Sequence, residues 1–401
     1  MFWNKKDDKR IYLDYAASTP IREEVKKVLL ESLGFFANPG TLHKEGVLAK
    51  QKLEETRAKI ATAIFARQKE IIFTSGATES NNLAILGLVK NWQKNNPNKT
   101  PHIIVSKIEH PSILEVCKKL EKEGVEVTYL DVLENGLIDI KKFKNSLKEN
   151  TILVSVIFAS NEIGVIQPIL EISKEIRHFK KYNLKNHLNI FPVLHTDASQ
   201  APMYEDINVQ KIHVDMMTIS SEKIYGPKGV SALFVKDGVK IDKILEGGSQ
   251  EFNLRAGTEN VPSILAFAKA LELAVIEREI ESARIREIQN YCFTLLEKNF
   301  SGKFILNGSR EQRLPNNVNI TFPNFDSELL VIELDAKGIA VSEKSACNTE
   351  DEESYVIENL RKENTGSIRI SFGKDTTKSQ IDFLIKSLKE ILEKYKNFHT
   401  K

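Results

Sequence analysis

Short apolar runs alternate along this chain with longer stretches in which apolar and polar residues recur at helical spacing. The apolar runs have the length of single strands, and most are separated by a helical stretch. Buried strands joined through helices are typical of a largely parallel sheet with helices on both faces. The pattern therefore predicts an α/β fold whose strands lie at residues 70–74, 102–106, 125–130, 152–158, 192–197, 216–220 and 230–235.

Helical spacing dominates both ends of the chain. One helix is predicted from about residue 22 and a longer one after the turn at residues 38–43. From residue 261 to 299 the helical pattern is almost uninterrupted, which predicts a bridge to a smaller domain. That domain would hold strands at 316–322, 339–342 and 367–371 and a final helix at 378–395. We expect an N-terminal segment (1–20), a large domain (21–260), and the bridging helix with a small α+β domain (261–401).

Composition and charge exclude several classes of protein. The chain has 401 residues, 41% of them hydrophobic and 28% charged, as expected for a globular protein with a sizeable core. The net charge of +2 gives no strong field for nucleic acid or for a membrane surface. No apolar run approaches the length of a membrane span and no signal-peptide pattern is visible, so we expect a cytoplasmic protein. Residues 177–190, rich in lysine, asparagine and histidine, predict an exposed insertion.

The chain contains three cysteines, too few for a disulfide framework or a structural zinc site. We therefore predict no metal site. Cys117 and Cys292 fall in helical apolar patterns and are expected to be small core residues. Cys347 differs, because it lies among serine, lysine, asparagine, threonine and acidic residues.

Polar residues gather where the predicted strands end. Lys223 lies in a turn between two apolar runs, a position where a lysine is more often simply solvated. Another run leads into Ser-Gly-Ala-Thr at 75–78, which opens a helix, and backbone N–H groups at a helix start can bind an anion. Asp197 ends a third apolar run, where a carboxylate is costly unless it meets a cation or several donors. Since ligands bind at the carboxyl ends of parallel strands, these residues predict one shared site.

Six motifs carry a resemblance that covers nearly the whole chain, from residue 12 to about 392. In their order and spacing they resemble those of the cysteine desulfurases, pyridoxal-phosphate enzymes of the class V aminotransferase group. The resemblance implies fold type I, with a large domain around a mostly parallel seven-stranded sheet and a small α+β domain. The motifs are Ser-Gly-Ala-Thr-Glu-Ser-Asn-Asn at 75–82, Glu-His at 109–110, Asn-Glu-Ile-Gly at 161–164, His-Thr-Asp-Ala-Ser-Gln at 195–200, Arg-Ala-Gly-Thr at 255–258 and Ser-Ala-Cys at 345–347.

The resemblance implies pyridoxal 5'-phosphate as cofactor, with Lys223 bound to its aldehyde and later acting as base and acid. Asp197 would keep the ring nitrogen protonated. Arg369 would bind the substrate carboxylate through two parallel bonds, with Asn161 beside it. Thr258 would reach the phosphate in a neighbouring subunit, which implies a homodimer. The remaining cofactor contacts implied are Gly76, Ala77, Thr78 and Ser220 at the phosphate and His110, Asn161 and Gln200 at the ring, with His110 also handling protons.

The segment around Cys347 resembles the cysteine loop of the desulfurases. This implies that the Cys347 thiolate takes the sulfur of L-cysteine as a persulfide and that L-alanine is released. The persulfide would pass to an acceptor protein, an iron–sulfur scaffold or a tRNA-thiolation enzyme.

Two departures from the family pattern leave other functions open. Glu222 stands where the family has a histidine that donates to the phosphate, and Glu343-Lys344 replaces Ser-Gly before Ser345. We expect the Glu222 carboxylate to turn away from the phosphate toward solvent, because like charges repel. The alternatives are a selenocysteine lyase or another class V aminotransferase, and a weakly active pseudoenzyme that serves as a partner-docking dimer.

Overall fold

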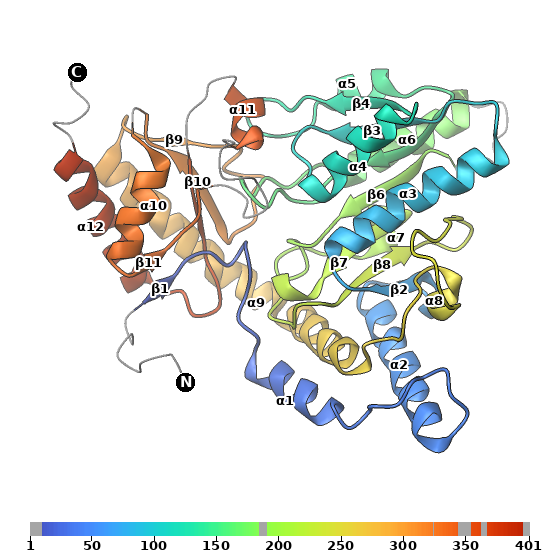
Figure 1. Ribbon diagram of the computed structural model, residues 1–401. Helices are drawn as coiled ribbons and strands as arrows, with labels where there is room; N and C mark the ends of the chain where they lie inside the picture. The colour runs from blue at the N-terminus through green and yellow to red at the C-terminus, as the bar shows by residue number, and fades with distance from the viewer. Residues whose placement is uncertain (1–9, 184–190, 324, 344–353, 362–366, 396–401) are drawn as a thin grey trace.

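The computed structural model describes residues 10–183, 191–323, 325–343, 354–361 and 367–395 (Figure 1). A seven-stranded sheet forms its centre, with strand order β2-β8-β7-β6-β5-β3-β4. Neighbouring strands are parallel except at β8, which is antiparallel to both β2 and β7. All seven predicted strands are confirmed: β2 (Ile71–Thr74), β3 (His102–Ser106), β4 (Glu126–Leu130), β5 (Thr151–Ser155), β6 (Val193–Asp197), β7 (Met216–Ser220) and β8 (Ser231–Val235).

Helices cover both faces of this sheet, as predicted. Successive strand residues point to opposite faces, so Ile72 and Ile103 pack with α3 and α4 while Phe73 and Ile104 pack on the other side with α2, α6 and α9. Burial on both faces explains why the strands are continuously apolar rather than alternating. The helices concerned are α2 (Lys44–Ala63), α3 (Ala77–Asn95), α4 (Pro111–Lys122), α6 (Ile169–Asn183) and α9 (Val261–Phe300), with α1 (Glu23–Ser32) packed on α9.

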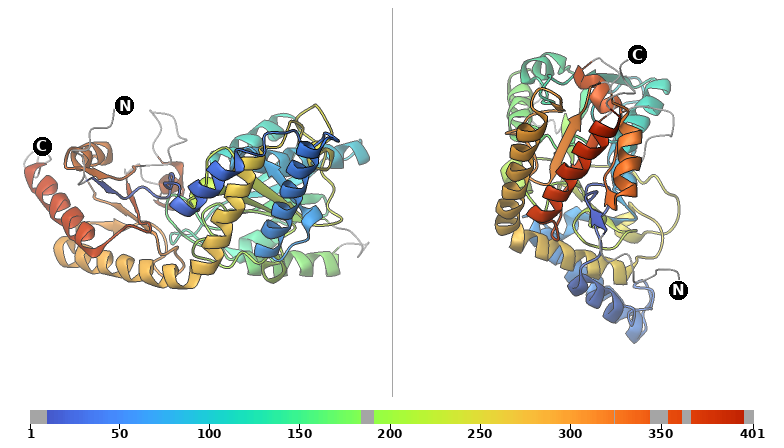
Figure 2. Two further views of the ribbon diagram at one scale, coloured as in Figure 1. Left: turned by 90° about the horizontal axis from the view of Figure 1, so that it is seen from below. Right: turned by 90° about the vertical axis from the view of Figure 1, so that its left-hand side faces the viewer.

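The predicted bridging helix is α9, which contacts α1 and α2 near its start and α12 (Lys378–Tyr395) near its end (Figure 2). Asn260 caps its start by accepting a hydrogen bond from the Ser263 backbone, and Pro262 occupies the first turn. The helix leads to a three-stranded antiparallel sheet of order β12-β10-β9. Its strands are β9 (Ile305–Leu306), β10 (Asn317–Thr321) and β12 (Ile368–Ser371), and α10 (Ser327–Ala336) packs on α12.

The N-terminal segment lies beside the C-terminal part of the chain. Strand β1 (Ile11–Tyr12) pairs in parallel with β11 (Ile339–Ala340), and Asp14 forms an isolated bridge with Ser371. The predicted strand at 339–342 is therefore shorter than expected and belongs to a separate two-stranded sheet. The division at residues 20 and 260 stays a prediction.

The first half of the predicted insertion is regular structure. Residues 177–183 continue α6, because its apolar stripe of Ile172, Ile176 and the half-buried Phe179 keeps helical spacing. The rest of the predicted insertion, 184–190, lies outside the described residues. Within the described ranges, no helix combines the length and apolar character needed to cross a membrane.

Candidate active site

A cavity of about 250 Å³ opens where β2, β6 and β7 end. This is the edge at which the sequence predicts a site, and the cavity volume is just below the range of about 300–1,000 Å³ that is usual for small-molecule pockets. The chain brings ten of the twelve predicted site residues to the lining of this one cavity. They are Gly76, Ala77, Thr78, His110, Asn161, Asp197, Gln200, Ser220, Lys223 and Arg369.

The turn that is predicted to bind an anion lies at the start of α3, a helix of 19 residues whose first N–H groups lack helical partners. Glu79 stabilises the turn, because its Oε2 accepts hydrogen bonds from the backbone N (2.7 Å) and Oγ (2.5 Å) of Ser75. Arg255 donates to Glu79 Oε1 at 2.9 Å. Burial alone would raise the pKa of Glu79, but the hydrogen bonds from Arg255 and Ser75 lower it. The turn is thus held by an ionised acid that faces a guanidinium.

Asp197 is buried at the end of β6 and receives three hydrogen bonds. Its Oδ1 accepts from Ser199 N (2.9 Å) and Ser199 Oγ (2.6 Å), and its Oδ2 accepts from Asn81 Nδ2 (2.8 Å). These donors stabilise a carboxylate in a place where it would otherwise be costly. Neither Asn81 nor Ser199 was predicted to act at the site, although each lies in one of the six motifs.

Lys223 ends the short helical turn η2 (Ser221–Lys223) that follows β7. Its Nζ donates to the backbone O of Ala17 at 2.5 Å and of Ala16 at 3.3 Å. Gln200 Nε2 also donates to Ala16 O, at 2.9 Å. The N-terminal segment therefore forms one wall of the cavity, through backbone carbonyls that sequence reasoning did not anticipate.

Glu222 lines the cavity and faces solvent only in part. Its side chain is 34% exposed, and its Oε1 lies 3.7 Å from Lys223 Nζ. Its backbone O accepts from both N and Oγ1 of Thr19, which fixes the turn. The expectation that the carboxylate turns to solvent is therefore wrong in part: the ammonium of Lys223 gives the charge a partner beside the cavity.

His110 caps α4: its Nδ1 accepts from Ser112 N at 3.1 Å. Burial lowers the pKa of His110 below its ordinary value, and the nearby Asp197 opposes this. The imidazole is therefore neutral at neutral pH, so it can accept a proton directly, without first giving one up.

Glu109, the residue before His110, is fully buried. Its Oε1 accepts from Ser106 Oγ (2.5 Å) and Ile157 N (2.8 Å), while its Oε2 has no partner among the described residues. Burial raises the pKa of Glu109 to about 8, so the folded protein holds a proton there at neutral pH.

This proton makes stability depend on pH. The folded pKa lies above the ordinary value of 4.5, so the folded state binds more protons than the unfolded state, and stability falls as pH rises from about 4.5 to about 8. Glu109→Gln imitates the protonated acid, so its stability should fall less over this pH range than that of the wild type. The difference should be up to about 1.4 kcal/mol per pH unit. Unfolding midpoints of both proteins at pH 5, 6.5 and 8 check this. A difference between them that does not grow with pH would contradict it.

Arg369 lies in β12 with its side chain 1% exposed. Its Nη2 donates to Asp14 Oδ1 (2.8 Å) and its Nη1 to Asn161 O (3.0 Å). Its Nε has no partner among the described residues, although an unpaired buried donor is costly. A ligand carboxylate in the cavity would satisfy it. Asp14, which orients this guanidinium, is another residue that sequence reasoning missed.

Of the predicted site residues that the structure describes, Thr258 alone does not line the cavity. Thr258 is exposed and accepts a hydrogen bond from Asn38 Nδ2 at 3.4 Å. Cys347 lies outside the described residues. The other cysteines are buried as predicted, and burial raises the pKa of both Cys117 and Cys292 to about 12, which leaves them unreactive as thiolates.

Known proteins resemble this chain over almost its full length. The family model described as aminotransferase class-V matches residues 11–384. The cysteine desulfurase IscS of Dictyoglomus turgidum is 42% identical over 96% of this chain and 95% of its own length. A solved NifS-like protein is 30% identical, with a TM-score of 0.86 over 96% of this chain and all of that one. The structure of SspA in complex with cysteine is 32% identical, with a TM-score of 0.75 over 91% of this chain and 99% of that one. The chain therefore belongs to the class V aminotransferases and, within them, to the cysteine desulfurase family.

Proposed function

We propose that this protein is a pyridoxal-phosphate-dependent cysteine desulfurase that converts L-cysteine to L-alanine and carries the sulfur away as a persulfide on Cys347. The observation that supports this most is the meeting of Lys223, Asp197 and Arg369 at one cavity. The Nε of Arg369 has no partner among the described residues. Together the three residues offer an amine, a buried acid and a carboxylate site.

The residues of the cavity fit pyridoxal 5'-phosphate. The turn at the start of α3 and Ser220 would hold the phosphate. Asp197, which accepts three hydrogen bonds, would face the ring nitrogen. His110 and Gln200 would contact the ring. When bound, the cofactor supplies an aldehyde that condenses with amines and a ring that delocalises negative charge. Phosphate binding by Thr258 of a second copy is part of the same proposal.

The chain's own residues supply the proton transfers and the positioning. The Lys223 amine would remove the Cα proton of the substrate and return a proton later, and such transfers are worth about 10²–10⁴ in rate. Arg369 would fix the substrate carboxylate, with Asn161 beside it. The Cys347 thiolate would then attack the substrate sulfur, forming an S–S bond as the C–S bond breaks. One thiol and one L-cysteine thus give one persulfide and one L-alanine.

A product assay tests the proposal. Purified protein supplied with L-cysteine should form L-alanine and protein-bound persulfide in equal amounts. A keto acid would indicate aminotransferase chemistry, and strong preference for selenocysteine would indicate a lyase. The glutamate at position 222, where the family has a histidine, favours the pseudoenzyme alternative. The absence of a visible absorbance band would support that alternative.

Glu222→His should tighten cofactor binding. A carboxylate at the cavity edge repels a phosphate dianion, whereas a histidine can donate to it. A charge-assisted hydrogen bond is worth about 1.5–3 kcal/mol, so the dissociation constant of pyridoxal phosphate should fall by about ten- to a hundredfold. Fluorescence titration of the cofactor-stripped proteins measures it. Glu222→Gln separates loss of charge from gain of a donor, and unchanged or weaker binding in Glu222→His would mean that the glutamate already suits the site.

We also propose that the protein is a homodimer that transfers sulfur to an acceptor protein in the cytoplasm. Thr258 lies away from its own chain's cavity, bonded to Asn38, and the exposed apolar side chains of Phe36, Leu42 and Val47 lie near Asn38 in the sequence. Exposed apolar side chains of this size favour a protein interface. The mass in solution tests the dimer.

A further inference from the structure

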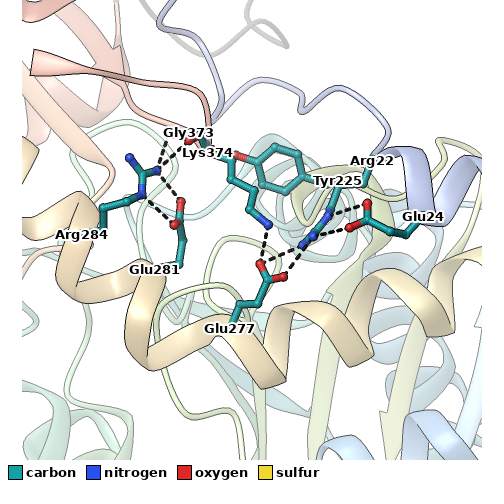
Figure 3. A network of polar contacts seen from close by, with 8 residues as sticks. All are labelled: Arg22, Glu24, Tyr225, Glu277, Glu281, Arg284, Gly373 and Lys374. Carbon is teal, nitrogen blue, oxygen red and sulfur yellow. Dashed lines mark hydrogen bonds and ion pairs between the residues drawn. The ribbon is translucent and has the colours of Figure 1, made fainter. Parts of the chain in front are cut away.

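The strand that carries Arg369 leads into a tightly held turn at residues 373–376. The turn closes on itself, since Thr376 Oγ1 accepts from Gly373 N (2.9 Å) and Gly373 O accepts from Thr376 N (3.0 Å). Side chains from α9 and from the turn that follows Lys223 meet it there (Figure 3). The end of the strand that carries Arg369 is thus held partly by segments outside its own sheet.

Arg284 of α9 holds the backbone of this turn. Its Nη2 donates to the carbonyl oxygens of Gly373 (3.1 Å) and Lys374 (2.9 Å), and its Nη1 to that of Thr376 (3.1 Å). The buried Glu281 pairs with Arg284 at 2.6 Å and holds the guanidinium in place. Because three backbone carbonyl oxygens of the turn accept hydrogen bonds from one guanidinium, the turn has little freedom to shift.

Glu277, one helical turn earlier in α9, holds the side chain of the same turn. Its Oε2 pairs with Lys374 Nζ at 2.6 Å and with Arg22 Nη1 at 2.9 Å, and its Oε1 accepts from Arg22 Nη2 at 3.0 Å. The hydrogen bond from Arg22 lowers the pKa of Glu277, so its charge persists at neutral pH. Glu277 thereby joins the turn after β12 to the residue before α1.

Tyr225 completes the connection to the site. Its hydroxyl accepts from Lys374 N at 2.8 Å, and its backbone O accepts from Arg22 N at 3.2 Å. It lies two residues after Lys223, is buried, and has a φ of 64°. An aromatic residue in this left-handed region is strained, and such strain persists where the surroundings fix it and clusters at functional sites.

We infer that Tyr225 and Glu277 are positioning residues that set the Lys223 amine and the Arg369 guanidinium at the spacing of one amino-acid substrate. The inference rests on the proposed function, because the substrate must meet Lys223 near its Cα and Arg369 at its carboxylate. A substrate that cannot reach both groups at once reacts more slowly, and a misplacement of about 1 Å can cost about a hundredfold in rate.

Two variants of the holoenzyme test the inference. Tyr225→Phe removes one acceptor and keeps the ring, and Glu277→Gln keeps the shape and removes the charge. Each should lower kcat/KM for L-cysteine about five- to tenfold while cofactor affinity stays within about twofold. Glu24→Gln is the matched control: Glu24 also pairs with Arg22, at 2.8 Å, but is not bonded to the 373–376 turn. Its kcat/KM should stay within about twofold of the wild type.

Cysteamine, which lacks the carboxylate, separates positioning from general damage. Spectral titration should show Tyr225→Phe and Glu277→Gln binding cysteamine like the wild type and L-cysteine more weakly. Arg369→Lys is the reference: if it does not discriminate between the two ligands, the proposed carboxylate clamp fails. If Arg369→Lys discriminates but the two variants do not, the clamp stands and the positioning role is refuted. Equal loss of both ligands with a lowered unfolding midpoint would also refute it, as a purely structural effect.

Discussion

Replacing Lys223 by alanine is expected to abolish the covalent link to pyridoxal phosphate and to lower turnover by at least about a thousandfold, since proton transfer alone contributes about 10²–10⁴. The amine is held by the carbonyls of Ala16 and Ala17 at the cavity wall, and among the described residues no other lysine lines that cavity. Borohydride reduction followed by peptide mass analysis should locate the cofactor on Lys223 in the wild type and on no residue in the variant.

The matched control is Lys228→Ala, which removes an exposed lysine from the same connection between β7 and β8. It should keep both the covalent link and the activity. The unfolding midpoint of Lys223→Ala should stay close to that of the wild type, because the change shortens a side chain that lines a cavity instead of opening a void in the core. Reductively trapped cofactor in Lys223→Ala would show that another amine carries it.

The sheet could be predicted from the sequence because its strands are buried on both faces. Such strands are continuous apolar runs, and no edge or turn chemistry is needed to find them. Strand β1 has two residues, Ile11 and Tyr12, and its partner β11 comes more than three hundred residues later. No local pattern marks a pairing this short and this distant, so the place of the N-terminal segment in the cavity wall could not be predicted.

The candidate site was predictable where it depends on side chains in motifs, and not where it depends on the backbone or on long-range pairs. Lys223, Asp197 and Arg369 meet at one cavity as the resemblance implied. The carbonyls of Ala16 and Ala17 carry no residue-type signal, since any residue has one. The pairing of Asp14 with Arg369 depends on two sheets meeting, which local spacing does not encode.

The second large effect is expected at Cys347. Cys347→Ser should bind L-cysteine with the same spectral change as the wild type, because binding depends on Lys223 and Arg369. It should lose L-alanine formation almost completely, since a hydroxyl does not accept the substrate sulfur as a thiolate does. The described residues before and after it contact the site's surroundings: Ser342 exchanges backbone hydrogen bonds with Arg369 at 2.6 and 3.2 Å, and Ser354 Oγ donates to Glu162 Oε2 at 2.5 Å.

Two assays on the same sample decide this prediction. The absorbance titration reports binding, and alanine quantification with thiol-reactive trapping of persulfide reports transfer. Cys117 and Cys292 are buried and cannot substitute for Cys347, so the variant should trap no persulfide. Normal alanine formation by Cys347→Ser would refute transfer to this cysteine and favour a lyase that releases sulfur without a protein carrier. Loss of both binding and alanine formation would instead place Cys347 in the binding site itself, before any sulfur is transferred.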